Sequence, residues 1–297
     1  MMEAWLADIP HEVSQYGRHR VLGTGKQGVL SLRLALDRRT VVKEQYSQVP
    51  LFAQKPMYLE ESLPAMAYMY IISPSGGVLQ GDTYRIDVAL DEGAQAHFTT
   101  QGATRIYRME DGFAAQAVSI SAGRGSYVEY MPDQIIPYAG SRFYQKTSLR
   151  VHSEATAVYS EIITPGRTAM GESFQYDVCY LKVDAKDFDG AQRFSDAAVL
   201  EPKKRDVKEF GVLDRDVVGT VYVMAPAKFA RQLSEQANST LVKRGIVGGA
   251  SVLPREMGIT ARMLGDSAGE LREAAYDIAA ITRKLVLGAP FGKIRKG

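Results

Sequence analysis

The sequence predicts a mainly β protein, either a many-stranded β-sandwich or a coiled β architecture, with two α-helices of which the second lies near the C-terminus. Apolar and polar residues alternate with period two through the middle of the chain, as expected for strands that bury one face. Most of these stretches are not separated by a segment long enough to form a helix. A doubly wound parallel sheet, in which strands alternate with helices, is therefore disfavoured.

About nine or ten strands are expected, in chain order. The clearest alternation lies in residues 83–90 and 174–180. Other stretches rich in β-branched and aromatic residues are 29–36, 96–101, 117–121, 147–152, 157–163 and 217–224. The charged stretch 185–216, with three consecutive basic residues at 203–205, is expected to be a solvated loop or hairpin and not a domain linker.

Two segments carry helix signals. The first is expected over residues 226–238, because proline suits the first helical position and apolar residues follow at spacing four. The second begins at Ser267, which has Glu270 in capping-box spacing, and ends at Gly288 and Pro290. Its apolar stripe consists of Leu271, Ala274, Ala275, Ile278, Ile281 and Leu285.

The composition excludes several classes of protein. The 297 residues are 45% apolar and 24% charged, which indicates a globular chain, and residues 1–297 are expected to form a single domain. A net charge of +2 argues against nucleic acid or an anionic membrane as partner. The longest apolar stretches are too short to span a bilayer, and residues 1–9 do not resemble a secretory signal. A cytoplasmic location is expected.

Histidine and cysteine, the usual ligands of tight metal sites, are scarce. The complete set is His11, His19, His97, His152 and Cys179, and none of them has the spacing of a metal-binding motif. A tight zinc or nickel site within one chain is improbable. A single cysteine also fits a reducing compartment. We expect His97 and His152, both in predicted strands, to be structural residues that face solvent or form hydrogen bonds.

A glycine-rich segment covers residues 75–82 and contains Gly76, Gly77 and Gly81. It lacks the spacing of nucleotide-binding loops and leads into a strand, whereas phosphate loops lead into a helix. The segment is therefore interpreted as a tight connection between strands, with Asp82 as a turn residue or a buried polar anchor. The serines also lack the spacing of a serine hydrolase motif.

Carboxylates are the remaining candidates for chemistry. Six of them lie beside apolar or aromatic stretches, where a carboxylate either faces solvent or needs a partner: Glu60, Asp82, Glu129, Asp133, Glu161 and Glu172. Arg167 and Glu172 could form a buried ion pair that braces a turn. Paired carboxylates could also serve acid and base catalysis, so a carboxylate-dependent hydrolase on a β framework is the alternative hypothesis.

Several segments, taken in order, resemble the urease accessory protein family UreD, also called UreH. They are residues 40–42 with 50–60, the Gly-Gly-Val-Leu-Gln-Gly-Asp segment 76–82, residues 98–108, the Glu-Tyr-Met-Pro-Asp segment beginning at 129, Glu161 with 165–172, residues 262–265, and 283–285. The resemblance runs from about residue 28 to 290. It marks as structural residues Gly76, Gly77, Gly81, Gly166, Arg167 and Gly171.

The resemblance implies a non-enzymatic scaffold and metallochaperone of urease maturation. Such a protein would help to deliver nickel to apo-urease in a complex with UreF and UreG, and would carry the ion through an internal passage. Nickel would then be cargo in transit, with no tightly bound cofactor. Oxygen ligands hold nickel less firmly than imidazole or thiolate, which suits a conduit. The carboxylates expected to line the path are Glu60, Asp82, Glu129, Glu161 and Glu172.

Overall fold

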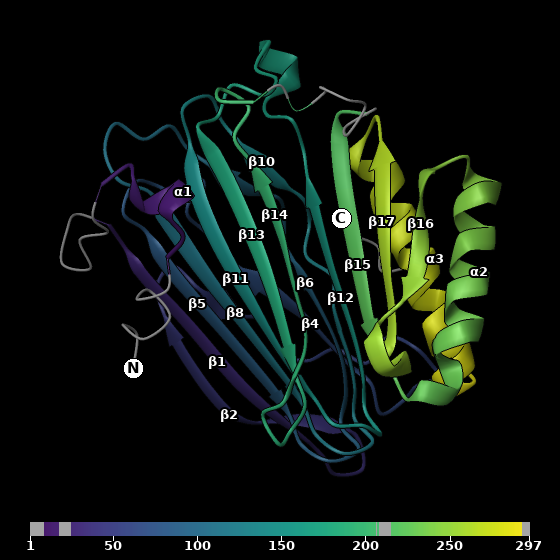
Figure 1. Ribbon diagram of the computed structural model, residues 1–297. Coiled ribbons are helices and arrows are strands. Elements are labelled where there is room, and N and C mark those ends of the chain that lie inside the picture. Colours follow the sequence, from purple (N-terminus) through teal and green to yellow (C-terminus); the bar gives the residue numbers. More distant parts are fainter. Residues whose placement is uncertain (1–8, 18–24, 206, 208–214, 293–297) are drawn as a thin grey trace.

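A computed structural model describes residues 9–17, 25–205, 207 and 215–292. Two β-sheets lie face to face, and two long helices pack beside one end of the larger sheet (Figure 1). The mainly β prediction is confirmed. His19 and residues 1–8 lie outside the described residues, as does part of the charged stretch 185–216.

The smaller sheet has seven strands. In spatial order they are β14 (Gln192–Leu200), β13 (Val178–Lys186), β11 (Arg142–Val151), β8 (Ala114–Ala122), β5 (Thr83–Leu90), β1 (Gln27–Leu36) and β2 (Thr40–Gln48). The β14 strand forms an antiparallel hairpin with β13. The charged stretch is therefore partly a hairpin, as predicted.

The larger sheet has ten strands. Its main path is β16 (Val247–Val252), β17 (Gly258–Gly265), β15 (Val217–Met224), β12 (Thr156–Ile163), β9 (Tyr127–Tyr130), β6 (Gln95–Thr100), β4 (Ala67–Ile72) and β3 (Phe52–Ala53). Two short strands, β10 (Ile135–Pro137) and β7 (Thr104–Ile106), branch from β12. The described residues thus form more strands than the nine or ten expected.

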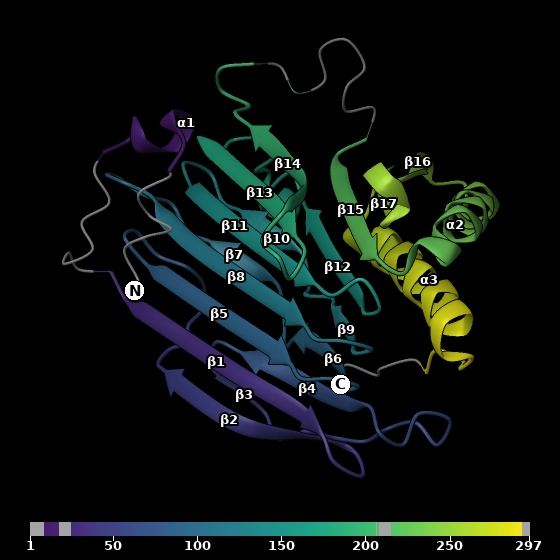
Figure 2. The ribbon, with the colours of Figure 1, turned by 60° about the horizontal axis from the view of Figure 1, so that its bottom comes forward.

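The centre of the molecule is a coil in which the chain alternates between the two sheets. It passes from β4 to β5, β6, β8, β9, β11, β12 and β13, and each strand lies parallel to the previous one in its own sheet (Figure 2). Parallel neighbours normally need a long crossover connection. Here the strand in the opposite sheet provides that crossover, so a largely parallel core forms without helices between strands.

The main core lies between the sheets. It contains inward-facing residues of both sheets, among them Leu30, Val118, Met69 and Phe98. A second cluster lies on the other face of the larger sheet, where Val221 and Ile259 pack against Leu233 and Ile278 of the helices. Consequently β12 has apolar contacts on both faces, and all eight of its residues are buried.

The part of the chain that the structure describes contains three α-helices: α1 (His11–Ser14), α2 (Ala230–Arg244) and α3 (Ala268–Leu287). The α3 helix begins as predicted, since the Ser267 side chain accepts a hydrogen bond from the Glu270 N–H, and Gly288 ends it in the left-handed conformation. The α2 helix follows a short 3-10 turn at Ala227–Phe229 and continues to Arg244, six residues past the expected end. Short 3-10 helices also occupy Thr168–Met170 and Pro254–Glu256.

The edge strand β16 is covered by α2. Asn238 of α2 accepts a hydrogen bond from the Ala250 N–H at 2.9 Å and donates one to the Ala250 carbonyl at 2.8 Å. Ser234 donates a further hydrogen bond to the same carbonyl. These side chains satisfy the backbone groups at the middle of the edge.

One predicted strand begins later than expected. Residues 174–180 alternate in sequence, but the strand begins only at Val178. Phe174 has a φ of 55°, in the left-handed region that a strand cannot contain. Its N–H donates to the Pro165 carbonyl, so this stretch is an irregular loop folded back on the preceding turn.

Candidate functional site

A cavity of about 220 Å³, lined by both apolar and polar side chains, lies between the two sheets. Its inner wall is formed by strands of both sheets, and its outer end by loops that include the exposed residues Ser73, Gln101 and Gly102. Two carboxylates line it, Asp133 and Glu161. The other polar side chains on its wall include Ser75, Tyr84, Thr100, Gln116, Tyr130, Gln145 and Tyr159.

A chain of hydrogen bonds crosses the cavity from one sheet to the other. Tyr84, Gln116 and Gln145 are in register on β5, β8 and β11, so their side chains project from the same face of the smaller sheet. The Gln116 amide donates to Gln145 at 2.9 Å, and Gln145 donates to the Tyr159 hydroxyl at 2.9 Å. Tyr159 in turn donates to the Glu161 carboxylate at 2.9 Å. Glu161 is therefore the acceptor at the end of the chain.

Glu161 lacks a close cationic partner among the described residues. Its side chain is buried, and its hydrogen bond comes from the neutral hydroxyl of Tyr159. Burial raises the pKa of Glu161 from the ordinary 4.5 to about 7, and the Tyr159 hydrogen bond lowers it only in part. Near neutral pH this carboxyl can both release a proton and attract a cation.

Asp133 stands at a different part of the wall. Its backbone N–H donates to the Thr100 hydroxyl at 2.9 Å, which fixes the loop after β9. Its carboxylate lies 3.5 Å from the Arg272 guanidinium of α3. Asp133 is thus partly compensated, whereas Glu161 is not.

The glycine-rich connection forms part of the cavity's outer end. Gly76 and Gly77 both line it. A Cβ atom on Gly77 would lie 2.5 Å from the Arg105 carbonyl oxygen and 2.5 Å from the Tyr107 ring, so only glycine fits there. Asp82 was expected to be either a turn residue or a buried polar anchor. It is buried and accepts hydrogen bonds from the N–H groups of Lys26 and Leu79, so it is the anchor.

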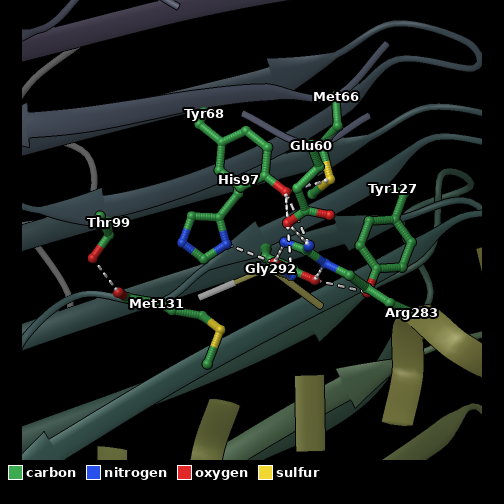
Figure 3. Close-up of polar contacts among 10 residues, drawn as sticks. Glu60, Met66, Tyr68, His97, Thr99, Tyr127, Met131, Arg283 and Gly292 are labelled. Carbon is green, nitrogen blue, oxygen red and sulfur yellow. Dashed lines mark hydrogen bonds and ion pairs between the residues drawn. The ribbon is translucent and has the colours of Figure 1, made fainter. Parts of the chain in front are cut away.

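A second polar cluster is buried between α3 and the larger sheet (Figure 3). At its centre is the fully buried Arg283, which donates to both oxygens of Glu129 at 2.6 and 2.7 Å and to Glu60 at 2.7 Å. The cluster also includes Tyr68 and Tyr127, which donate to Glu60 and Glu129 respectively. Polar groups from four separate segments thereby pair with one another out of water, although Glu60 Oε2 is buried without a hydrogen-bond partner.

Charges in this cluster are compensated. Burial raises the pKa of Glu129, but the charge of Arg283 and the hydrogen bonds from His97 and Arg283 outweigh it and lower the pKa to about 2. His97 is buried and its Nδ1 lies 2.6 Å from Glu129, so it is the hydrogen-bonded structural histidine that was expected. His152 accepts a hydrogen bond from the Glu154 N–H.

Arg167 and Glu172 form the predicted ion pair. Arg167 Nε donates to Glu172 at 2.8 Å, and a second guanidinium nitrogen contacts the other carboxylate oxygen. The pair is partly exposed and not buried as predicted, but it does brace the turn, since Glu172 also accepts a hydrogen bond from the Ala139 N–H. Gly166 and Gly171 within this turn have φ values of 139° and 74°, which favour glycine.

The five carboxylates expected on a nickel path therefore do not share one surface. Glu161 lines the cavity, Glu60 and Glu129 bind Arg283, Asp82 binds backbone N–H groups, and Glu172 binds Arg167. Their role in nickel transfer stays a prediction. Within the described ranges, no three His, Cys, Asp or Glu side chains come together in a way that could hold a metal ion.

The sequence reasoning missed several residues of these sites. Gln116 and Gln145 occupy inward positions of strands, where a polar residue at an otherwise apolar position was the available signal. Arg283 follows Ala275 and Ala279 at spacing four on the buried side of α3, and a charge in such a stripe indicates a buried partner.

Comparison with known proteins adds independent information. The family described as UreD urease accessory protein matches residues 26–296. A urease accessory protein UreD of Cenarchaeum symbiosum is 45% identical over 276 residues, covering 92% of this chain and 97% of that protein. A protein named urease accessory protein UreD 2 of Streptomyces griseus is 36% identical, with 91% and 94% covered. None of the helices in the described ranges is long and apolar enough to cross a membrane.

Proposed function

The chain belongs to the UreD family of urease accessory proteins, and from this membership we propose that it helps to deliver nickel to apo-urease as a non-catalytic metallochaperone and scaffold. Membership in the family supports a role in urease maturation. The relatives are named as accessory proteins, which suggests a non-catalytic role. We propose UreF, UreG and apo-urease as the partners.

The observation that carries the nickel proposal is the carboxylate of Glu161 inside the intersheet cavity. A dication that enters a protein interior loses its hydration, and a buried carboxylate with oxygen-rich neighbours offsets part of that cost. Tyr159, Gln145 and Gln116 supply further oxygen atoms along the same wall. Such neutral oxygen ligands bind nickel more weakly than imidazole or thiolate would.

The contacts narrow the proposed path. Glu60 and Glu129 are occupied by Arg283, so a cation could reach them only by displacing a buried guanidinium. Asp82 is occupied by backbone N–H groups. We therefore propose that the ion passes Asp133 and Glu161 and that Glu60, Asp82 and Glu129 maintain the fold.

Activation of apo-urease with nickel, UreF and UreG tests this proposal. Glu161→Gln keeps the size of the side chain and removes its negative charge, so urease activation should fall while co-purification with UreF is retained. The exposed Glu154, in the turn that precedes β12, provides the matched control Glu154→Gln, which should activate urease normally.

Two results would contradict the proposal. Full urease activation by Glu161→Gln would remove the carboxylate from the path. A double replacement of Glu161 and Glu172 by Ala that leaves folding, complex assembly and activation unchanged would exclude both carboxylates from nickel transfer.

A further inference from the structure

The polar row that contains Glu161 continues beyond the cavity to the edge of the molecule. Glu161 on β12 is in register with Thr220 on β15, and Thr220 is in register with Arg262 on β17. Residues opposite one another in neighbouring strands project from the same face of the sheet. Arg262 therefore lies on the same face as Glu161, two strands nearer to the edge, and its side chain is 65% exposed.

Arg262 at the end of this row binds a residue of the smaller sheet, Asp196 of its edge strand β14. Arg262 Nη2 lies 2.7 and 2.6 Å from the two carboxylate oxygens of Asp196, and the Tyr222 hydroxyl donates to Asp196 at 2.8 Å. Asp196 is 22% exposed. Figure 2 shows β14, the edge strand of the smaller sheet, near β15 of the larger sheet. The ion pair joins β14 to β17 at this edge.

Aromatic rings fill the space between the cavity and this ion pair. Tyr159, which lines the cavity, stacks on Tyr222 with ring centroids 6.1 Å apart. Tyr222 stacks on Phe194 of β14 with centroids 5.6 Å apart. The charges of Asp196 and Arg262 both act on Glu161. Tyr222 therefore contacts both Tyr159 of the cavity wall and the Asp196 carboxylate at the edge.

We propose that Asp196 and Arg262 form a closed second portal of the passage, through which a divalent cation that has passed Glu161 crosses between β14 and β17. This inference rests on the proposed function. A dication would replace the Arg262 guanidinium at the Asp196 carboxylate, so the negative charge is compensated both before and after passage. An ion pair this exposed to water is weak, which allows it to open.

The rate at which the single cysteine of the chain is labelled can measure how often the portal opens. Cys179 is fully buried on β13, and its pKa is raised to about 12 by burial and by the charge of Glu161. In the folded chain, Arg262→Gln should increase the rate at which a thiol reagent labels Cys179 by about fivefold, the factor expected for the loss of an exposed ion pair. The matched control Arg231→Gln breaks the exposed pair with Glu256 and should leave the rate unchanged.

Nickel transfer tests the portal directly in the assembled complex. Asp196→Lys places a cation at the portal and should reduce urease activation by about tenfold or more, since like charges at short range repel strongly. Ser195→Lys adds the same charge to the exposed outer face of β14 and should not reduce activation. If Asp196→Lys folds poorly, Asp196→Asn should give a smaller loss of activation in the same direction.

The outcomes separate the portal from the proposed function. Normal activation by the Asp196 variants, with activation lost in Glu161→Gln, would refute the portal and keep the passage. Normal activation by Glu161→Gln would refute the passage itself. Labelling of Cys179 at the same rate in Arg262→Gln and in the unsubstituted chain, at equal thermal stability, would show that the ion pair does not hold the edge closed.

Discussion

Replacing Glu161 by Gln should remove a loss of stability that the native protein suffers as pH rises. In the folded chain the pKa of Glu161 is about 7, raised by burial from the ordinary 4.5. The folded state therefore binds this proton more tightly than the unfolded state does. The contribution of Glu161 to stability is fully present below about pH 4.5. It is lost as the pH rises from 4.5 to about 7, and it changes no further above that pH.

The pKa shift of Glu161 determines how strongly the stability of the protein depends on pH. Each pKa unit corresponds to about 1.4 kcal/mol, so the shift of Glu161 corresponds to about 3 kcal/mol in the free energy of unfolding. Most of it falls between pH 5 and 8, where the native chain should lose roughly 2 to 3 kcal/mol that Glu161→Gln does not lose. At pH 8 the variant should therefore be more stable than the unsubstituted protein.

Urea denaturation at a series of pH values between 5 and 8 measures this difference. Glu154→Gln, which changes an exposed carboxylate, should follow the pH profile of the unsubstituted chain. Parallel profiles for the unsubstituted chain and Glu161→Gln would refute the reasoning, because they would show that the carboxyl is not held in a strongly desolvated site.

Three further substitutions test the structural sites by urea denaturation or thermal unfolding. Arg283→Met should cost about 3 to 5 kcal/mol, because it leaves the Glu129 carboxylate buried without a cation, and a loss below about 1 kcal/mol would contradict this. Gly77→Ala should cost about 1 to 3 kcal/mol through steric conflict, whereas Gly102→Ala, with open space around it, should not. Asp82→Ala should cost roughly 2 to 4 kcal/mol, since two N–H groups and a hydroxyl lose their acceptor, and a near-neutral effect would disprove the anchoring role.

Local signals predicted the helices well and the loops less well. The Ser267 cap and Gly288 mark the ends of α3 in both sequence and structure. The α2 helix runs past Asn238 because that residue is used for its contact with β16, and Gly245 provides the left-handed end instead. Around Phe174, apolar and polar residues alternate as they do in a strand, but the backbone turns there.

The coiled topology was one of two expected architectures, and only the structure distinguishes them. Strand pairing in the coil joins segments that are separated by a strand of the other sheet, and alternation of burial is the same whichever strand is the neighbour. The fully buried β12 shows no alternation in burial at all, because helices cover its second face.

Sequence reasoning found Glu161 but not what surrounds it. Its hydrogen-bonding chain combines residues of three strands from two sheets. Glu129 was likewise expected to line the nickel path. Its partner Arg283 lies 154 positions away in the chain, so the sequence gives no sign of the ion pair. Whether a buried carboxylate is occupied or available depends on such distant contacts, which no local pattern encodes.

The contact between Asn238 and Ala250 has a consequence for how this protein can associate. A primary amide presents one donor and one acceptor in the same plane, so at Ala250 it replaces the peptide group of an eleventh strand. Exposed strand edges otherwise invite pairing between molecules. With this edge occupied at its centre, copies of the chain cannot extend the ten-stranded sheet into a fibril from β16 unless α2 first moves away.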